Sequence, residues 1–411
     1  MADADEQNAH NRSGRVRSWT GPALLSYGYR PFFLAAGIWA MLAMGLWVGE
    51  ISGLAYLPTR FDPISWHAHE MLYGYLGAAL AGFLLTAVPN WTGRLPILGW
   101  PLAGLLSLWC LGRVAIGVSI WLPWAVVILA QLGFPALLAG MILREVLAGK
   151  NWKNLPLLAL YLLYITGNAL FLSGVMEGRF AAEGMGLRLG LAVTVILLSL
   201  VGGRVIPSFT RNWLVKQGRS ELPASFGLID KLVLLSTIFC LAIWVVFPRP
   251  EDLAPLFWLV GGGHLLRLIR WNGWMCRKEP LLWILHVGYL FVPAGFLALG
   301  LSGLNSQIFP DIGALHLWMA GGIGVMTLAI MTRASLAHAG LPLRATARVT
   351  ASYLLVLGAV ILRSLVAYGL MGREGLYASL FCWVAGFAIY VWTYWPIWTR
   401  PNVTRRAPSR R

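Results

Sequence analysis

The amino-acid sequence predicts an all-α, polytopic membrane protein with twelve transmembrane helices. Of its 411 residues, 58% are hydrophobic and 12% are charged, and a soluble protein carries about twice this charged fraction. Apolar runs of the length that crosses a bilayer, about 20 residues, recur along the chain. These runs are unbroken rather than alternating, which excludes a transmembrane β-barrel and favours helices, whose backbone groups are satisfied internally.

Proline, glycine and charged residues separate the predicted spans, as at Pro248-Arg249-Pro250. Segments 1–26 and 401–411 are expected to be cytoplasmic tails that flank one membrane domain, 27–400. We expect no cleavable signal peptide, because no apolar run precedes a small-residue cleavage site in the first tail. The spans are expected at 32–51, 66–88, 97–117, 122–143, 155–176, 187–206, 229–247, 254–271, 281–300, 312–332, 350–370 and 376–397.

The basic residues predict the orientation of the chain. The net charge of +16 does not indicate a nucleic-acid partner, because the lysines and arginines lie between apolar segments instead of in one patch. They concentrate in alternate loops, and loops rich in lysine and arginine remain in the cytoplasm. Both termini are therefore expected in the cytoplasm. The opposite set of loops holds little more than Arg60, Arg179, Arg188, Arg249 and Arg373.

A weak repeat connects three predicted spans. Residues 88–94, 205–211 and 329–333 each carry a threonine and an arginine at or near the end of a span. The repeat predicts three units of four helices each. The alternative is that proline, threonine and arginine suit any helix end at the inner leaflet.

Six of the seven histidines lie in or beside predicted spans. Ionisable groups are costly in a bilayer, so each is a functional candidate, although a single intramembrane histidine is often only a structural hydrogen-bonding group. His67, His69 and His316 are expected near the outer side, at matched depth on two inward-running spans. Two such histidines can hold a haem iron, so we predict a haem b with His69 and His316 as axial ligands and His67 as the alternative.

Four further residues are candidates for cofactor or metal binding. His264 and His286 lie on consecutive spans and are predicted to form a second site, for copper or another haem. Arg267 lies three residues after His264 and could bind a haem propionate. Glu70 could serve a second metal, and His338, at the inner face, is a further candidate ligand. Acidic residues are otherwise nearly absent from the spans, which argues against a transporter built on carboxylate relays.

Several motifs resemble those of a known family. Residues 29–33 read YRPFF, residues 66–74 read WHAHEMLYG and residues 82–93 read GFLLTAVPNWTG. With Leu315-His316, 324–327 and 331–338, they resemble the signatures of the NnrS family, and the resemblance covers essentially the whole chain. It implies a bacterial inner-membrane protein with twelve spans that binds haem and copper. It also implies a role in tolerance of nitric oxide and nitrosative stress, often alongside denitrification.

Three functions follow as alternatives. The first is a nitric oxide reductase-like oxidoreductase, the second a non-catalytic protein that binds or senses nitric oxide, and the third a haem or metal transporter. No CxxCH motif for covalent haem is present, so the first alternative needs electrons from quinol or a separate donor. Twelve spans with histidines on spans 2 and 10 also resemble the haem–copper oxidase plan, by fold analogy alone. Span 10 has one histidine where that plan has two.

Overall fold

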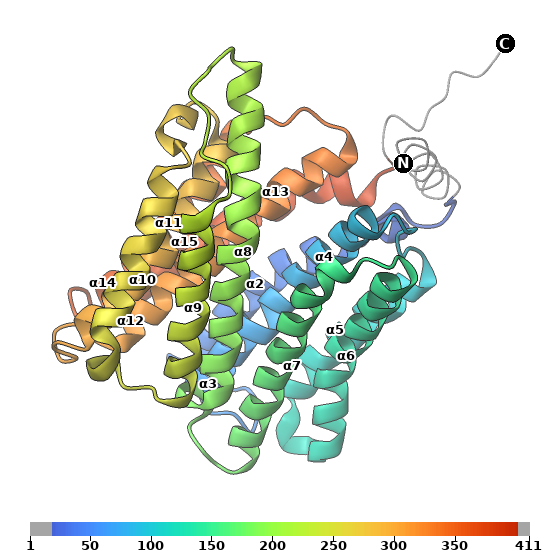
Figure 1. Ribbon diagram of the computed structural model, residues 1–411. Helices are drawn as coiled ribbons and strands as arrows, with labels where there is room; N and C mark the ends of the chain where they lie inside the picture. Colours follow the sequence, from blue (N-terminus) through green and yellow to red (C-terminus); the bar gives the residue numbers. More distant parts are fainter. Residues whose placement is uncertain (1–18, 402–411) are drawn as a thin grey trace. The chain divides into compact units, whose positions relative to one another are not determined.

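The computed structural model describes residues 19–401, which form long helices and no strand (Figure 1). The tails at 1–18 and 402–411, and with them His10, lie outside the described residues. The long helices are α2 (Tyr29–Ile51), the continuous α3–η2–α4 (Pro63–Thr92), α5 (Trp100–Gly117), α6 (Trp124–Ala148), α7 (Leu155–Met176), α8 (Met185–Lys216), α9 (Leu228–Val246), α10 (Pro250–Ile269), α11 (Pro280–Ser302), the continuous α12–η7–α13 (Asp311–Ala339), α14 (Ala347–Ala367) and α15 (Arg373–Thr399).

Each of the twelve predicted spans coincides with one of these helices, and the all-α polytopic membrane fold is confirmed. Within the described residues, eleven of the helices are long and apolar enough to cross a membrane. The exception is α10, whose 20 residues include the charged Glu251, Asp252 and Arg267. The boundaries of α8 differ most from the prediction, because this helix of 32 residues continues to Lys216 instead of ending near 206.

The helices group into two compact units. Of the described residues, unit 1 comprises 19–190, 334–342 and 391–401, and unit 2 comprises Leu191–Arg333 and Leu343–Tyr390. The helices α8, α13 and α15 contribute residues to both units. This grouping differs from the three four-helix units that the repeated span ends suggested.

The arginine of the YRPFF motif joins distant parts of unit 1. The Arg30 side chain is buried, and its Nη1 donates hydrogen bonds to the carbonyls of Ala23 at 3.0 Å, Trp398 at 3.3 Å and Arg400 at 3.0 Å. The last carbonyls of a helix lack partners within that helix, and a nearby cation interacts favourably with its C-terminus. Arg30 therefore caps the end of α15, which gives this motif a structural role.

Candidate functional site

His69 is completely buried within unit 1, and polar groups face both of its ring nitrogens. Its Nδ1 lies 2.9 Å from Oε1 of Glu70, and its Nε2 lies 3.1 Å from the side-chain amide of Asn168. Glu70 is also completely buried, and both of its oxygens accept hydrogen bonds of 2.7 Å from Nη1 of Arg113. A carboxylate paired with a guanidinium accepts hydrogen bonds. Nδ1 of His69 therefore donates to the Glu70 carboxylate, and Nε2 faces Oδ1 of Asn168, an oxygen that also accepts hydrogen bonds.

Arg113 extends this cluster to two further helices. It lies on α5, is largely buried, and donates from Nη2 to the side-chain oxygen of Gln131 on α6. The space that it occupies with Glu70 depends on a glycine, since a Cβ at Gly74 would lie 2.6 Å from Nη1 of Arg113. Glu70, predicted as a metal ligand, is thus placed in a buried ion pair that fixes the His69 ring.

Aromatic side chains enclose the His69 ring. The ring centroids of Phe61, Tyr73 and Phe171 each lie 5.4 Å from that of His69. Tyr73 is held in place because its hydroxyl donates a hydrogen bond of 2.7 Å to the carbonyl of Gly186. A Cβ at Gly190 would overlap this hydroxyl, so close approach of α8 requires a glycine there. The shell excludes water from the imidazole and fixes its orientation.

The other predicted ligands of unit 1 have separate surroundings. His67 stacks on Trp47, with ring centroids 4.1 Å apart, and so has different partners from His69. His338 lies against Tyr27 and Tyr29, at centroid distances of 5.4 and 5.5 Å. The structure therefore does not bring His338 into the shell of rings around His69.

His316 belongs to unit 2, whereas His69 belongs to unit 1, so their pairing across a haem stays a prediction. The Nδ1 of His316 lies 2.7 Å from the carbonyl of Ile312. The two histidines share a local feature: each ends a short α-helical segment and is followed directly by a π-helical one, Glu70–Tyr75 or Leu317–Val325. π-Helical insertions within α-helices occur frequently at functional sites.

In unit 2, a directed chain of hydrogen bonds surrounds His264. Arg267 donates from Nη1 to the Tyr289 hydroxyl at 2.8 Å, and that hydroxyl lies 2.9 Å from Nδ1 of His264. The Nε2 of His264 lies 2.9 Å from the Thr237 hydroxyl, which donates to the Val233 carbonyl at 2.6 Å. Because a carbonyl can only accept, the Thr237 hydroxyl donates to Val233 and accepts from Nε2 of His264, which therefore carries a proton. Both nitrogens of His264 are thus engaged by hydroxyl groups.

Arg267 is paired with an acidic residue that the sequence analysis did not select. It is completely buried, and its Nε donates to Asp230 at 2.9 Å, while Arg270 contacts the same carboxylate at 3.3 Å. Asp230 lies in the first turn of α9, where its side chain also accepts a hydrogen bond from the backbone of Gly227 at 3.0 Å. The sequence does contain a signal that could have identified Asp230. It is an aspartate three residues after a glycine at the start of a span, and acidic side chains favour helix N-termini.

His286 does not join the His264 chain directly. Its Nε2 lies 2.9 Å from the Thr210 hydroxyl, and its ring is in edge contact with Trp271, which in turn contacts Tyr289. The expected second metal site therefore consists of two histidines with different hydrogen-bonding partners. Within 19–401, no group of three or more histidine, cysteine, aspartate or glutamate side chains is arranged to hold a metal ion.

Residues 23–402 match the family model described as NnrS protein. The chain belongs to the NnrS family. No curated protein matches it. In this NnrS-family member the WHAHEMLYG segment supplies His69, Glu70 and Gly74, so the motif that carries the resemblance also builds the buried cluster of unit 1. Asn168, Arg113 and Gln131 complete that cluster from outside the motif.

A glycine on α8 makes room for the buried arginine of unit 2. A Cβ at Gly203 would overlap Nη2 of Arg267, whereas a Cβ at Gly262 on α10 would meet nothing within 4 Å. We expect Gly203→Ala to lower the free energy of unfolding by about 1–3 kcal/mol, the usual cost of overpacking. Gly262→Ala should be neutral or slightly stabilising, because alanine favours helices. Thermal unfolding in detergent would measure both, and equal stability of the two variants would contradict the role of Gly203.

Proposed function

We propose that this NnrS-family protein holds haem b through His69 and acts on nitric oxide, by binding it and by reducing or otherwise detoxifying it. The family supports the connection to nitric oxide. One observation carries the haem assignment: the buried Glu70 carboxylate, itself held by Arg113, accepts from Nδ1 of His69, so that Nε2 would bind the iron once the Asn168 side chain moves away from it. Ligating imidazoles commonly have their second nitrogen fixed by a carboxylate in this way.

The residues have distinct roles in this proposal. Haem iron would supply a centre that exchanges electrons and can bind a gas at an open position. Glu70 and Arg113 orient the imidazole and keep its proton on Nδ1, and the rings of Phe61, Tyr73 and Phe171 exclude water. His316 remains our proposed second axial ligand, with His67 as the alternative to His69. Electrons would come from quinol or a separate donor.

The His264 side chain is not arranged to bind copper in this structure. Both of its nitrogens are engaged by hydroxyl groups, and ligation would break a chain that also satisfies Arg267. We therefore propose that His264 and Arg267 have a positioning role in unit 2, in which they hold Tyr289 and Asp230 in place. We also propose that the protein lies in a bacterial cytoplasmic membrane with both termini inside, on the evidence of the basic loops.

Purified protein tests the haem assignment through its absorption spectrum. His69→Ala should lower bound haem at least tenfold, whereas His338→Phe, which keeps the aromatic contact with Tyr27 and Tyr29, should retain it. Size-exclusion profiles would confirm that both variants are folded. Full haem content in a folded His69→Ala variant would rule the assignment out.

Titration of the reduced protein with nitric oxide tests the activity. A spectral shift, followed by consumption of nitric oxide at an electrode when a quinol donor is added, is the expected result. Binding without consumption would support the non-catalytic alternative. Absence of both would overturn the proposed function and favour the transporter alternative.

A further inference from the structure

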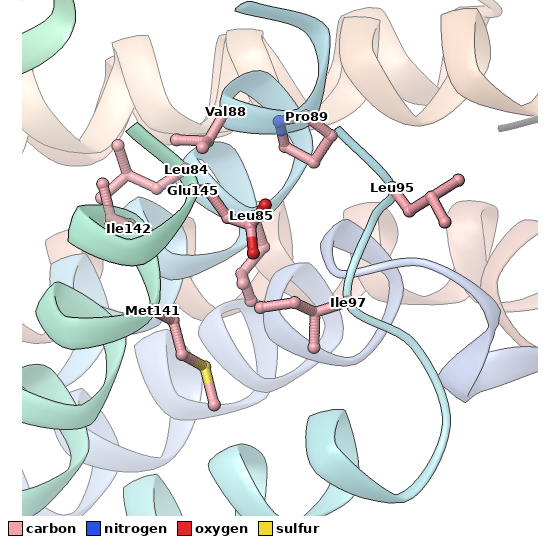
Figure 2. Close-up of a pocket in the computed structure, with 9 residues that line it drawn as sticks. All are labelled: Leu84, Leu85, Val88, Pro89, Leu95, Ile97, Met141, Ile142 and Glu145. Carbon is pink, nitrogen blue, oxygen red and sulfur yellow. The ribbon is translucent and has the colours of Figure 1, made fainter. Parts of the chain in front are cut away.

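A pocket in unit 1 lies where α4 and α6 end, outside the His69 cluster (Figure 2). Residues of α4 and α6 form two of its walls, and the segment that follows α4 forms the third, as Figure 2 shows for Leu95 and Ile97. Glu145 is the one charged residue among the nine that line it. The lining residues are Leu84, Leu85, Val88, Pro89, Leu95, Ile97, Met141, Ile142 and Glu145.

Two arginines converge on the carboxylate of Glu145. Arg94 donates from Nε to Oε2 at 2.9 Å, and Arg144 donates from Nη2 to Oε1 at 2.7 Å. The carboxylate side chain is 7% exposed, whereas the arginine side chains are 46% and 67% exposed. Glu145 therefore holds two solvent-facing guanidinium groups beside the pocket. Two cations on one anion leave a net positive charge, to which Lys150 and Lys153 in the following loop add.

Exposed tryptophans mark the level of this pocket in the membrane. Trp91 in the last turn of α4, Trp100 at the start of α5 and Trp152 just after α6 are 37%, 74% and 56% exposed. Tryptophan is enriched at the headgroup level of a bilayer. The pocket is thus apolar inside, cationic at its edge and located at the boundary between hydrocarbon and headgroups.

We infer that an anionic phospholipid binds at this site, with its phosphate on Arg94 and Arg144 and an acyl chain along the apolar mouth of the pocket. Guanidinium groups bind phosphate oxygens through paired hydrogen bonds, and basic pockets between transmembrane helices bind anionic headgroups. The net positive edge favours a lipid with net negative charge over a zwitterionic one. A quinone, which also has an apolar tail, carries no charge that would require the arginines.

The test uses the full-length protein in nanodiscs that contain phosphatidylglycerol and phosphatidylcholine with the same acyl chains. Native mass spectrometry after release into detergent counts the lipids that remain bound. We expect wild type to retain phosphatidylglycerol in preference to phosphatidylcholine. Met141→Trp, whose larger ring would protrude at the mouth of the pocket, and the triple variant Arg94→Gln/Arg144→Gln/Glu145→Gln, which removes the charges without leaving one unpaired, should each lower that retention at least tenfold.

Arg179→Gln serves as the control, because Arg179 is exposed and pairs with the exposed Glu177 at 2.7 Å; it should behave like wild type. Equal retention of the two lipids by wild type, unchanged retention in both pocket variants, or a quinone recovered in place of the lipid would overturn the inference. Haem content reports separately on the proposed function and should be the same in all of these proteins.

Discussion

Replacing Arg113 with methionine should destabilise the protein by about 3–5 kcal/mol, the loss that follows when one partner of a buried ion pair is removed. Glu70 is completely buried, and Arg113 provides the positive charge that contacts both of its oxygens. Without that charge the carboxylate must lie unpaired in a low-dielectric interior or take up a proton. Thermal unfolding of purified protein in detergent would show the effect as a lower midpoint.

Two further variants separate the charge effect from lost packing. Arg113→Met/Glu70→Gln removes both charges and should recover most of the loss, because replacing both members of a buried pair is often nearly neutral. Arg179→Met removes an arginine from an exposed pair and should change stability by less than about 1 kcal/mol. If the double variant were no more stable than Arg113→Met, the unpaired carboxylate would not be the cause.

In unit 2, Asp230→Ala should also cost about 3–5 kcal/mol, since it leaves the completely buried Arg267 without its carboxylate. The remaining contacts of Arg267 with the Tyr289 hydroxyl and the Ser199 carbonyl are to neutral groups. Asp252→Ala is the matched control, because its pair with Arg249 is exposed and 3.9 Å long and such pairs contribute about 0–1 kcal/mol. Comparable losses in both variants would show that burial of the Asp230 pair is not decisive.

The candidate site was only partly predictable from the sequence. Intramembrane ionisable residues are rare enough to be noticed individually, so His69, Glu70, His264 and Arg267 could be selected as candidates. The residues that contact them could not be selected from the sequence. Glu70 was expected to serve a second metal, yet it contacts His69, its neighbour in the chain, at the point where the helix becomes π-helical. Asp230 was missed because it lies at the very start of a span.

The sequence by itself determined the helices and the membrane environment. Hydropathy is a sum over neighbouring residues, and about 20 apolar residues in a row satisfy their backbone groups in lipid only as a helix.

The tertiary structure alone decided which polar groups meet. Asn168 lies 99 residues after His69, Arg113 lies 43 residues after Glu70, and Arg267 lies 37 residues after Asp230. Such pairs form through the packing of different helices, and small residues such as Gly74, Gly190 and Gly203 set how closely those helices and side chains approach. No local pattern along the chain encodes that packing.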